Sequence, residues 1–188
     1  EGFDLCRTMR ARGYRWPIDM FIVPERGIAQ ARNALMARAL ATGAHFIAML
    51  DDDEWPEPGW LNAMLKAQRD SGADALHGQV RRVFEHTPAP WSLHCAGIAP
   101  FDRPTGLVDM IESSSNVLMT RASVAALGEP WFDPAFALSG GEDRDFFTRM
   151  KRDGARFAWA GDAVVNAFVP ASRLTLSWII KRAYRVGN

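Results

Sequence analysis

The chain has 188 residues, of which 48% are hydrophobic and 23% are charged, values that are ordinary for a globular protein. They exclude wholesale disorder and a membrane-embedded protein, and the length suits one domain with a substantial core. Lysine plus arginine equals aspartate plus glutamate at 22 each, so bulk charge gives no reason to expect nucleic acid as a partner.

The two cysteines, Cys6 and Cys95, lie far apart and lack the CxxC spacing of a zinc or redox site. They fit a reducing compartment, where disulfides are rare. No apolar run approaches the roughly 20 residues of a membrane-spanning helix, and the first residues lack the basic-then-apolar order of a signal peptide. We therefore expect a cytoplasmic protein.

The first part of the chain alternates helical and strand patterns. Apolar spacing predicts a helix over residues 3–15, a strand over 18–23 and an alanine-rich helix over 28–40 that ends near Gly43. The continuous apolar run at 46–50 predicts a buried strand. This strand-helix-strand order predicts an α/β fold with a parallel sheet and right-handed crossovers.

Four consecutive acids, Asp51 to Glu54, follow the 46–50 strand directly. In open α/β sheets, ligands bind just beyond the carboxyl ends of the strands. Asp51 and Asp53 can reach one hard divalent cation, because magnesium sites use one or two carboxylates plus substrate phosphates. The alternative is that the acids only favour the start of the next helix, at roughly 0.3–1 kcal/mol each. Three successive aspartates exceed that need, since crowded like charges repel.

The middle of the chain contains one long irregular stretch. A helix is expected over 58–71 and a strand over 75–84, and residues 85–112 then carry several prolines and glycines with aromatic residues between them. Loops of that length inside a compact domain are usually functional or mobile. A short strand at 117–119 and a short helix at 121–127 follow.

A second acid pair, Glu142-Asp143, follows Gly140-Gly141 and opens a helix that ends at 153–154. A carboxylate that faces a substrate hydroxyl can act as general base, and a neighbouring acid can raise its pKa. The alternative is an ordinary N-capped helix. The acid pair alone does not decide between these two interpretations.

The last part of the chain is predicted to form strands at 155–159 and 163–168 and an amphipathic basic helix over 174–186. Arg182 and Arg185 share one face of that helix and could clamp a diphosphate, because guanidinium groups match phosphate geometry. The alternatives are a solvated basic face or a helix that lies on a membrane surface.

Taken together, these stretches resemble glycosyltransferase family 2, inverting enzymes of the GT-A fold that transfer a sugar from a nucleotide-sugar donor. The matching segments are 26–33, with a glycine and Ala-Arg-Asn; 46–60, with a DxD motif; 141–143, with Glu-Asp; and 173–188, a tail like that of bacterial polysaccharide-type members. The resemblance implies a single GT-A domain over 1–188, with a mostly parallel, Rossmann-like sheet flanked by helices.

The resemblance also implies roles for individual residues. Asp51 would lie near the donor ribose and diphosphate, Asp53 would bind Mn²⁺ or Mg²⁺, Asp143 would be the catalytic base and Glu142 would contact the acceptor. The acceptor would be a saccharide or a lipid-linked saccharide in cell-surface polysaccharide synthesis, with the tail helix as a peripheral contact to the inner face of the membrane. The other residues expected to contact the donor are Arg26, Gly27, Arg32, Asn33, Arg182 and Arg185.

The family begins with two strands that hold the nucleotide, and neither precedes Glu1, so the chain is expected to be a fragment that could be inactive. Two other functions are kept as alternatives. A sugar nucleotidyltransferase would show a glycine-rich basic loop near its start. A non-catalytic sugar-binding domain could use the aromatic residues of 85–112, although two acid pairs argue against it.

Overall fold

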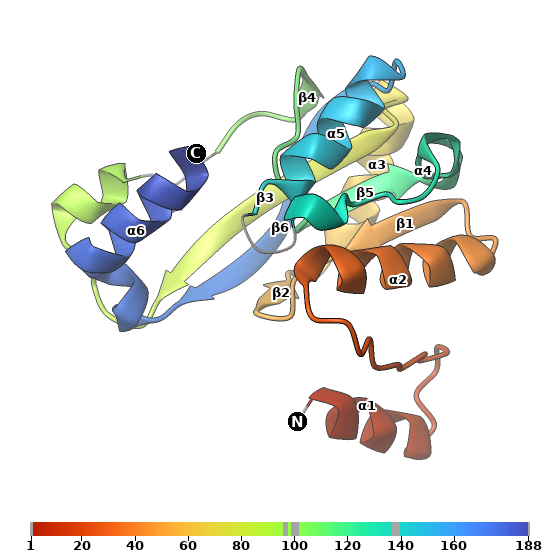
Figure 1. Cartoon of the computed structure of the whole chain (residues 1–188), viewed down its shortest axis with the longest axis horizontal. Coiled ribbons are helices and arrows are strands. Elements are labelled where there is room, and N and C mark those ends of the chain that lie inside the picture. The colour runs from red at the N-terminus through yellow and green to blue at the C-terminus, as the bar shows by residue number, and fades with distance from the viewer. Residues whose placement is uncertain (1, 96–97, 99–101, 137–139, 188) are drawn as a thin grey trace.

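The computed structural model describes residues 2–95, 98, 102–136 and 140–187. Its strands form one sheet, which Figure 1 shows at the centre of the molecule. The strand order is β1 (Phe46–Met49), β5 (Val117–Thr120), β3 (Ala75–Phe84), β6 (Phe157–Val169) and β2 (Glu54–Pro56), and β4 (Gly106–Val108) pairs with the first residues of β6.

The sheet is mixed, so the expected α/β class is confirmed but the expectation of a mostly parallel sheet is wrong for the described strands. Only β3 and β6 pair in parallel, and the other four pairings are antiparallel. β1 and β3 do point the same way, but β5 lies between them and runs in the opposite direction. The reason is that the segment after β3 returns the chain to the carboxyl end of β1, so β5 starts there.

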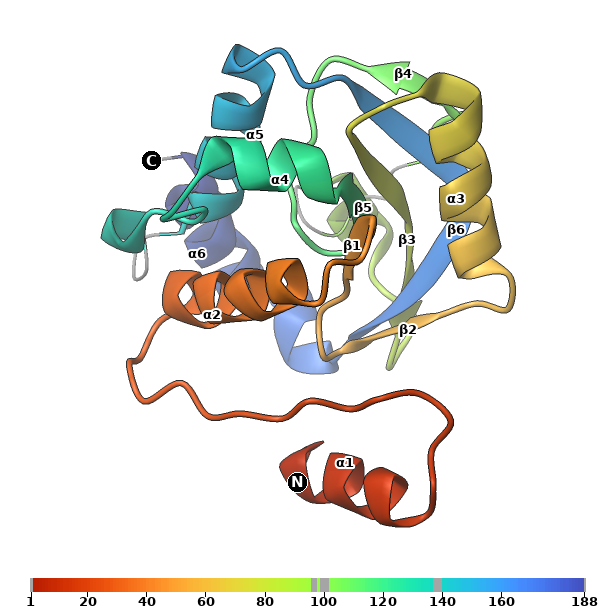
Figure 2. The ribbon, with the colours of Figure 1, turned by 90° about the vertical axis from the view of Figure 1, so that its right-hand side faces the viewer.

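Helices cover both faces of this sheet. On one side lie α2 (Ile28–Ala41), α4 (Arg121–Leu127) and α5 (Glu142–Arg152), and on the other lies α3 (Trp60–Ser71), as Figure 2 shows. Side chains alternate between the two layers: Val117 and Met119 of β5 pack with the first set of helices, whereas Leu118 packs with α3. Both faces of the sheet are therefore covered by hydrophobic cores, which hold the strands in place.

Two of the expected strands differ from the structure. Residues 18–23 are extended but join no strand in the described part of the sheet, and Ile22 is 79% exposed. Prolines at 17 and 24 bracket this segment and lack the N–H that a ladder needs. The two strands expected at 155–159 and 163–168 form one continuous β6, because the chain stays extended through Gly161.

The ends of the chain lie at the margins of the molecule. Helix α1 (Gly2–Ala11) buries none of its residues and stands apart from the sheet in both views (Figures 1 and 2). Helix α6 (Leu176–Gly187) follows the short turn η3 (Ala171–Leu174) and packs through Ile179 against the end of β6. No helix in the described part of the chain has the length and apolarity that a bilayer span requires. The other 3₁₀ turns are η1 (Pro90–His94) and η2 (Pro134–Phe136).

The acidic turn joins opposite ends of the strand order. β1 is the first strand and β2 the last, yet only residues 50–53 separate them in the sequence. Because so short a segment cannot cross a flat sheet of five strands, the sheet curls and brings its edges together (Figure 2). The acids are thereby placed over the ends of the central strands.

Candidate active site

The acidic turn exposes three carboxylates, Asp51 to Asp53, and directs the fourth, Glu54, inward. The Asp51 carbonyl accepts from the Glu54 amide at 3.2 Å, which closes the turn. The Asp51 and Asp53 side chains are each 48% exposed, while Glu54 points inward and accepts a hydrogen bond from the Ser115 hydroxyl. Burial raises the pKa of Asp51 and of Glu54, and the Arg32 guanidinium opposes this effect at Asp51.

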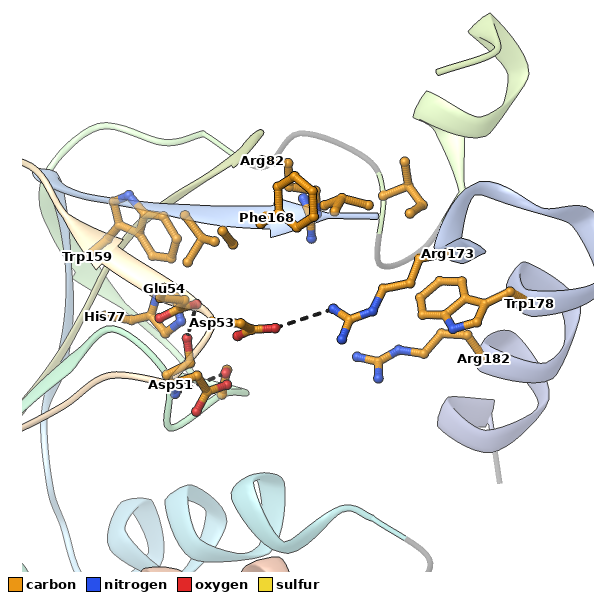
Figure 3. Close-up of a pocket in the computed structure, with 16 residues that line it drawn as sticks. Asp51, Asp53, Glu54, His77, Arg82, Trp159, Phe168, Arg173, Trp178 and Arg182 are labelled. Carbon is orange, nitrogen blue, oxygen red and sulfur yellow. Dashed lines mark hydrogen bonds and ion pairs between the residues drawn. The ribbon is translucent and has the colours of Figure 1, made fainter. Parts of the chain in front are cut away.

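A cavity of about 550 Å³ lies beside this turn, and it is lined by both acidic and basic side chains. Figure 3 shows the carboxylates at one side and the arginines of the tail at the other. Arg173 Nη1 lies 3.5 Å from Asp53 Oδ2, so the two sides meet at that pair. The lining of the cavity includes Asp51, Asp53, Glu54, His77, Arg82, Ser115, Trp159, Arg173 and Arg182.

Arg32 of α2 connects the two acid pairs of the sequence. Its Nη1 donates to Glu142 Oε1 at 2.6 Å and to Asp143 Oδ1 at 2.7 Å, and its Nη2 lies 3.8 Å from Asp51 Oδ1. The Arg32 side chain is only 8% exposed, so these interactions are little screened by water. One buried cation therefore positions carboxylates from the β1 end and from α5 together.

Helix α5 begins at the second acid pair. Gly141 precedes it with a φ of 103°, a conformation that favours glycine, and Glu142 and Asp143 occupy the first turn. The Glu142 side chain is 7% exposed and that of Asp143 is 20% exposed. Burial raises the pKa of Asp143, while the Arg32 guanidinium and the neighbouring polar groups of Ser114 lower it. Asp143 is thus the carboxylate of the pair that remains open to a ligand.

The structure distributes the predicted site residues over three environments. Asp51, Asp53 and Arg182 line the cavity, and Arg32 joins Glu142, Asp143 and Asp51. Arg26, Gly27 and Asn33 do not line the cavity. Arg26 is exposed, Gly27 is the residue before α2, and Asn33 exchanges hydrogen bonds with the backbone of Phe132. The Arg185 side chain falls outside the described part of the chain.

The cavity residues that the sequence did not point to include His77, Arg82, Ser115, Trp159 and Arg173. His77 and Arg82 lie on β3 and Trp159 lies on β6, where they read as ordinary strand residues. His77 and Trp159 are register partners in the parallel pair, which only the pairing of β3 with β6 reveals, and the register shift after Gly78 breaks strict alternation along β3. Burial lowers the pKa of Arg82, and nearby Arg182 adds to that effect.

The carboxylates of the acidic turn suit a metal cation whose remaining coordination positions are filled by a bound substrate. Within the described ranges, no group of three or more histidine, cysteine, aspartate or glutamate side chains could hold a metal ion by itself. Asp51 and Asp53 supply oxygen atoms at an open cavity, and Glu54 Oε2 is a buried oxygen without a hydrogen-bond partner in the described residues. This donor set matches Mg²⁺ or Mn²⁺ bound jointly with substrate phosphates.

Comparisons with known proteins identify a matching family model and a curated relative. Residues 6–125 match the family model described as glycosyl transferase family 2. The chain is 35% identical over 176 residues to the succinoglycan biosynthesis protein ExoM of Rhizobium meliloti (strain 1021), covering 92% of this chain and 55% of that protein. The chain thus spans about half the length of this curated relative.

Solved structures share the fold at low sequence identity. The crystal structure of S. aureus TarS 1-349 in complex with UDP-GlcNAc superposes with a TM-score of 0.64 and 15% identity, covering 89% of this chain and 46% of that chain. The structure of A197 from STIV gives a TM-score of 0.51 and 17% identity, covering 76% and 68%. These similarities concern the arrangement of the elements.

Proposed function

The chain belongs to glycosyl transferase family 2 and has its GT-A fold, and on this premise we propose that it transfers a sugar, with inversion, from a nucleotide-sugar donor to a hydroxyl acceptor. The observation that carries the proposal is the single guanidinium of Arg32, which holds Asp143 and Asp51 together beside a cavity with separated charges. Binding of UDP-GlcNAc by TarS supports a nucleotide-sugar as the donor.

Asp143 is proposed as the general base. Its side chain is open to a ligand, its pKa is raised by burial, and it sits at the start of α5. It would accept the proton of the acceptor hydroxyl while that oxygen attacks the anomeric carbon opposite the departing diphosphate, which inverts the configuration. Glu142 is more deeply buried and, through its bond to Arg32, would hold the base in place.

The donor diphosphate would bind across the cavity between the carboxylates and the arginines. Arg173 and Arg182 face the acidic turn and would neutralise the charge that develops on the leaving group (Figure 3). Asp53 and Asp51 would hold a divalent cation, which when bound stabilises negative charge on the phosphate oxygens. Arg185, on the same helix, is proposed to join this group.

The biological setting is proposed from the relative. ExoM is named for succinoglycan biosynthesis, which supports a role in polysaccharide synthesis with a saccharide or lipid-linked acceptor. We propose that residues 1–188 act as one domain, on the cytoplasmic side. Leu176, Ile180 and Tyr184 form an exposed apolar stripe on the basic helix α6, which supports a peripheral membrane contact there.

A donor screen tests the proposal on the chain as it stands. We expect one nucleotide-sugar among UDP-, GDP- and dTDP-hexoses to raise the melting temperature in the presence of Mn²⁺. A donor at 100 times its Kd would add about 2.7 kcal/mol of stability, or a shift of roughly 5–11 °C. Asp53→Asn should remove most of the part of the shift that depends on Mn²⁺, because it deletes a proposed ligand oxygen.

The matched control for that screen is Asp52→Asn, which changes the neighbouring exposed acid that does not line the cavity. It should bind the donor as the wild type does. If Mn²⁺ made no difference to donor binding in the wild type, the metal assignment would be rejected. If the chain released pyrophosphate from a nucleoside triphosphate and a sugar phosphate, it would be a nucleotidyltransferase instead.

The rate of transfer should depend on pH through Asp143. A base must be ionised, so kcat/KM should fall as pH decreases through a pKa that burial has raised above the ordinary 3.8. Glu142→Gln removes a negative charge that raises this pKa, so the acid limb should move to lower pH. Steady-state kinetics across pH in both proteins checks this, and an acid limb that moved upward would contradict the assignment.

A further inference from the structure

His77 lies in the cavity, yet the proposed chemistry leaves it without a role. It sits on β3 next to Trp159 of β6, at the side of the cavity where the carboxylates lie and away from Arg173 and Arg182 (Figure 3). Only 9% of the residue is exposed, although its ring lines the cavity. The imidazole therefore lies with the carboxylates and apart from the arginines that are proposed to bind the diphosphate.

The hydrogen bond of His77 fixes which ring nitrogen carries the proton. Nδ1 lies 2.6 Å from the Gly78 carbonyl oxygen. Because a carbonyl oxygen can only accept, Nδ1 must donate, and Nε2 of a neutral ring is then a hydrogen-bond acceptor. Gly78 marks a register shift between β3 and β6, and an added Cβ there would collide with the Ala163 carbonyl oxygen, so the local backbone is tightly held.

The ring itself is also fixed in orientation and in charge. Trp159 stacks on it with centroids 4.9 Å apart and an interplanar angle of 14°. Burial lowers the pKa of His77 to about 4, so the imidazole is uncharged at neutral pH. In the described part of the chain, the one hydrogen bond assigned to this side chain is the one made by Nδ1. Nε2 is therefore a preorganised neutral acceptor at the cavity.

We propose that His77 Nε2 accepts a hydrogen bond from a hydroxyl of a sugar ring bound at this end of the cavity, and that it thereby helps to select the sugar. The inference rests on the proposed function and adds a specificity residue to it. A neutral acceptor has nothing to offer a phosphate oxygen, whereas a sugar hydroxyl can donate to it. The sugar could be that of the donor or that of the acceptor, and the two are separated by experiment.

The test compares His77→Phe with His77→Gln in the whole chain. Phenylalanine keeps an aromatic ring against Trp159 but supplies no nitrogen, whereas glutamine keeps an acceptor. The probes are the members of the donor panel above and their free nucleoside diphosphates, measured by titration calorimetry. If the donor sugar is recognised, His77→Phe should weaken the nucleotide-sugar roughly 5- to 100-fold, leave the nucleoside diphosphate unchanged, and be partly rescued by glutamine.

If the acceptor is recognised instead, donor binding should stay unchanged in His77→Phe while KM for the acceptor saccharide rises by a similar factor. Equal weakening of nucleotide-sugar and nucleoside diphosphate would show either a contact with the nucleotide or a merely structural role, and both would overturn the inference that His77 selects the sugar, as would unchanged binding and kinetics. If the wild type binds no member of the panel, the proposed function falls and this inference with it.

A measurement on the wild type keeps the inference falsifiable if His77→Phe does not fold. Long-range ¹H–¹⁵N spectra of the imidazole, assigned by comparison with His77→Gln, report the protonation of each ring nitrogen. We expect Nδ1 protonated and Nε2 unprotonated at neutral pH, and a shift of the Nε2 signal when the sugar binds. A protonated Nε2 at neutral pH would overturn the inference without bearing on the proposed transferase function.

Discussion

Replacing Asp143 with asparagine is expected to lower the rate of sugar transfer about 10²- to 10⁴-fold, the usual contribution of general acid–base catalysis. Asparagine has nearly the same shape but cannot accept the acceptor proton, so kcat should fall while donor binding persists. The measurement is the rate of sugar transfer at saturating donor, compared with that of an active enzyme carrying the wild-type residue. Normal transfer by Asp143→Asn would eliminate Asp143 as the base.

The same variant should fold at least as well as the wild type. Burial raises the pKa of Asp143, so the folded state binds the proton more tightly than the unfolded chain does. The ionised carboxylate therefore costs stability as pH rises through the raised pKa, and a neutral amide avoids that cost. Asp145→Asn is the matched control on the same helix, since Asp145 pairs with Arg149 and should change transfer by only a few-fold.

The parts of this structure that sequence predicted well are those determined by local pattern. The apolar run 46–50 and the acids after it were expected as a strand and a ligand-binding turn, and they form β1 and the turn beside the cavity. The start of α5 is also predicted by residues adjacent in the sequence, namely two glycines followed by two acids. Apolar periodicity and glycine position encode these features within a few residues.

What sequence did not predict depends on contacts between distant segments. The sequence predicts a donor contact for Arg32, and it does not reveal the pairing that the structure shows, in which Arg32 binds Glu142, 110 positions away, as well as Asp143. Asn33 likewise holds the backbone of Phe132, 99 positions away. No local pattern records such pairs. The direction of β5 was missed for a related reason, because periodicity shows that a segment is a strand but not how it is paired.

Replacing Arg32 with leucine is expected to destabilise the chain by about 3–5 kcal/mol, because it leaves carboxylates buried without their cation. The side chains of Arg32 and Glu142 are 8% and 7% exposed, so water cannot replace the lost interactions. For a chain of this length the change corresponds to a decrease of roughly 6–20 °C in Tm, measured by calorimetry or circular dichroism at neutral pH. It should be among the most destabilising single changes at the site.

Arg38→Leu provides the control, because it removes an arginine from the same helix whose ion pair with Asp19 is exposed at 52% and 65%. An exposed pair contributes about 0.2–1 kcal/mol, so the two variants should differ severalfold in their effect on stability. Arg32→Lys separates charge from geometry. A lysine retains the positive charge but lacks the planar fork that reaches several carboxylates, so this variant should recover part of the stability and little of the transfer rate. Equal stability of Arg32→Leu and Arg38→Leu would show that Glu142 and Asp143 find other partners, and that Arg32 does not organise the site.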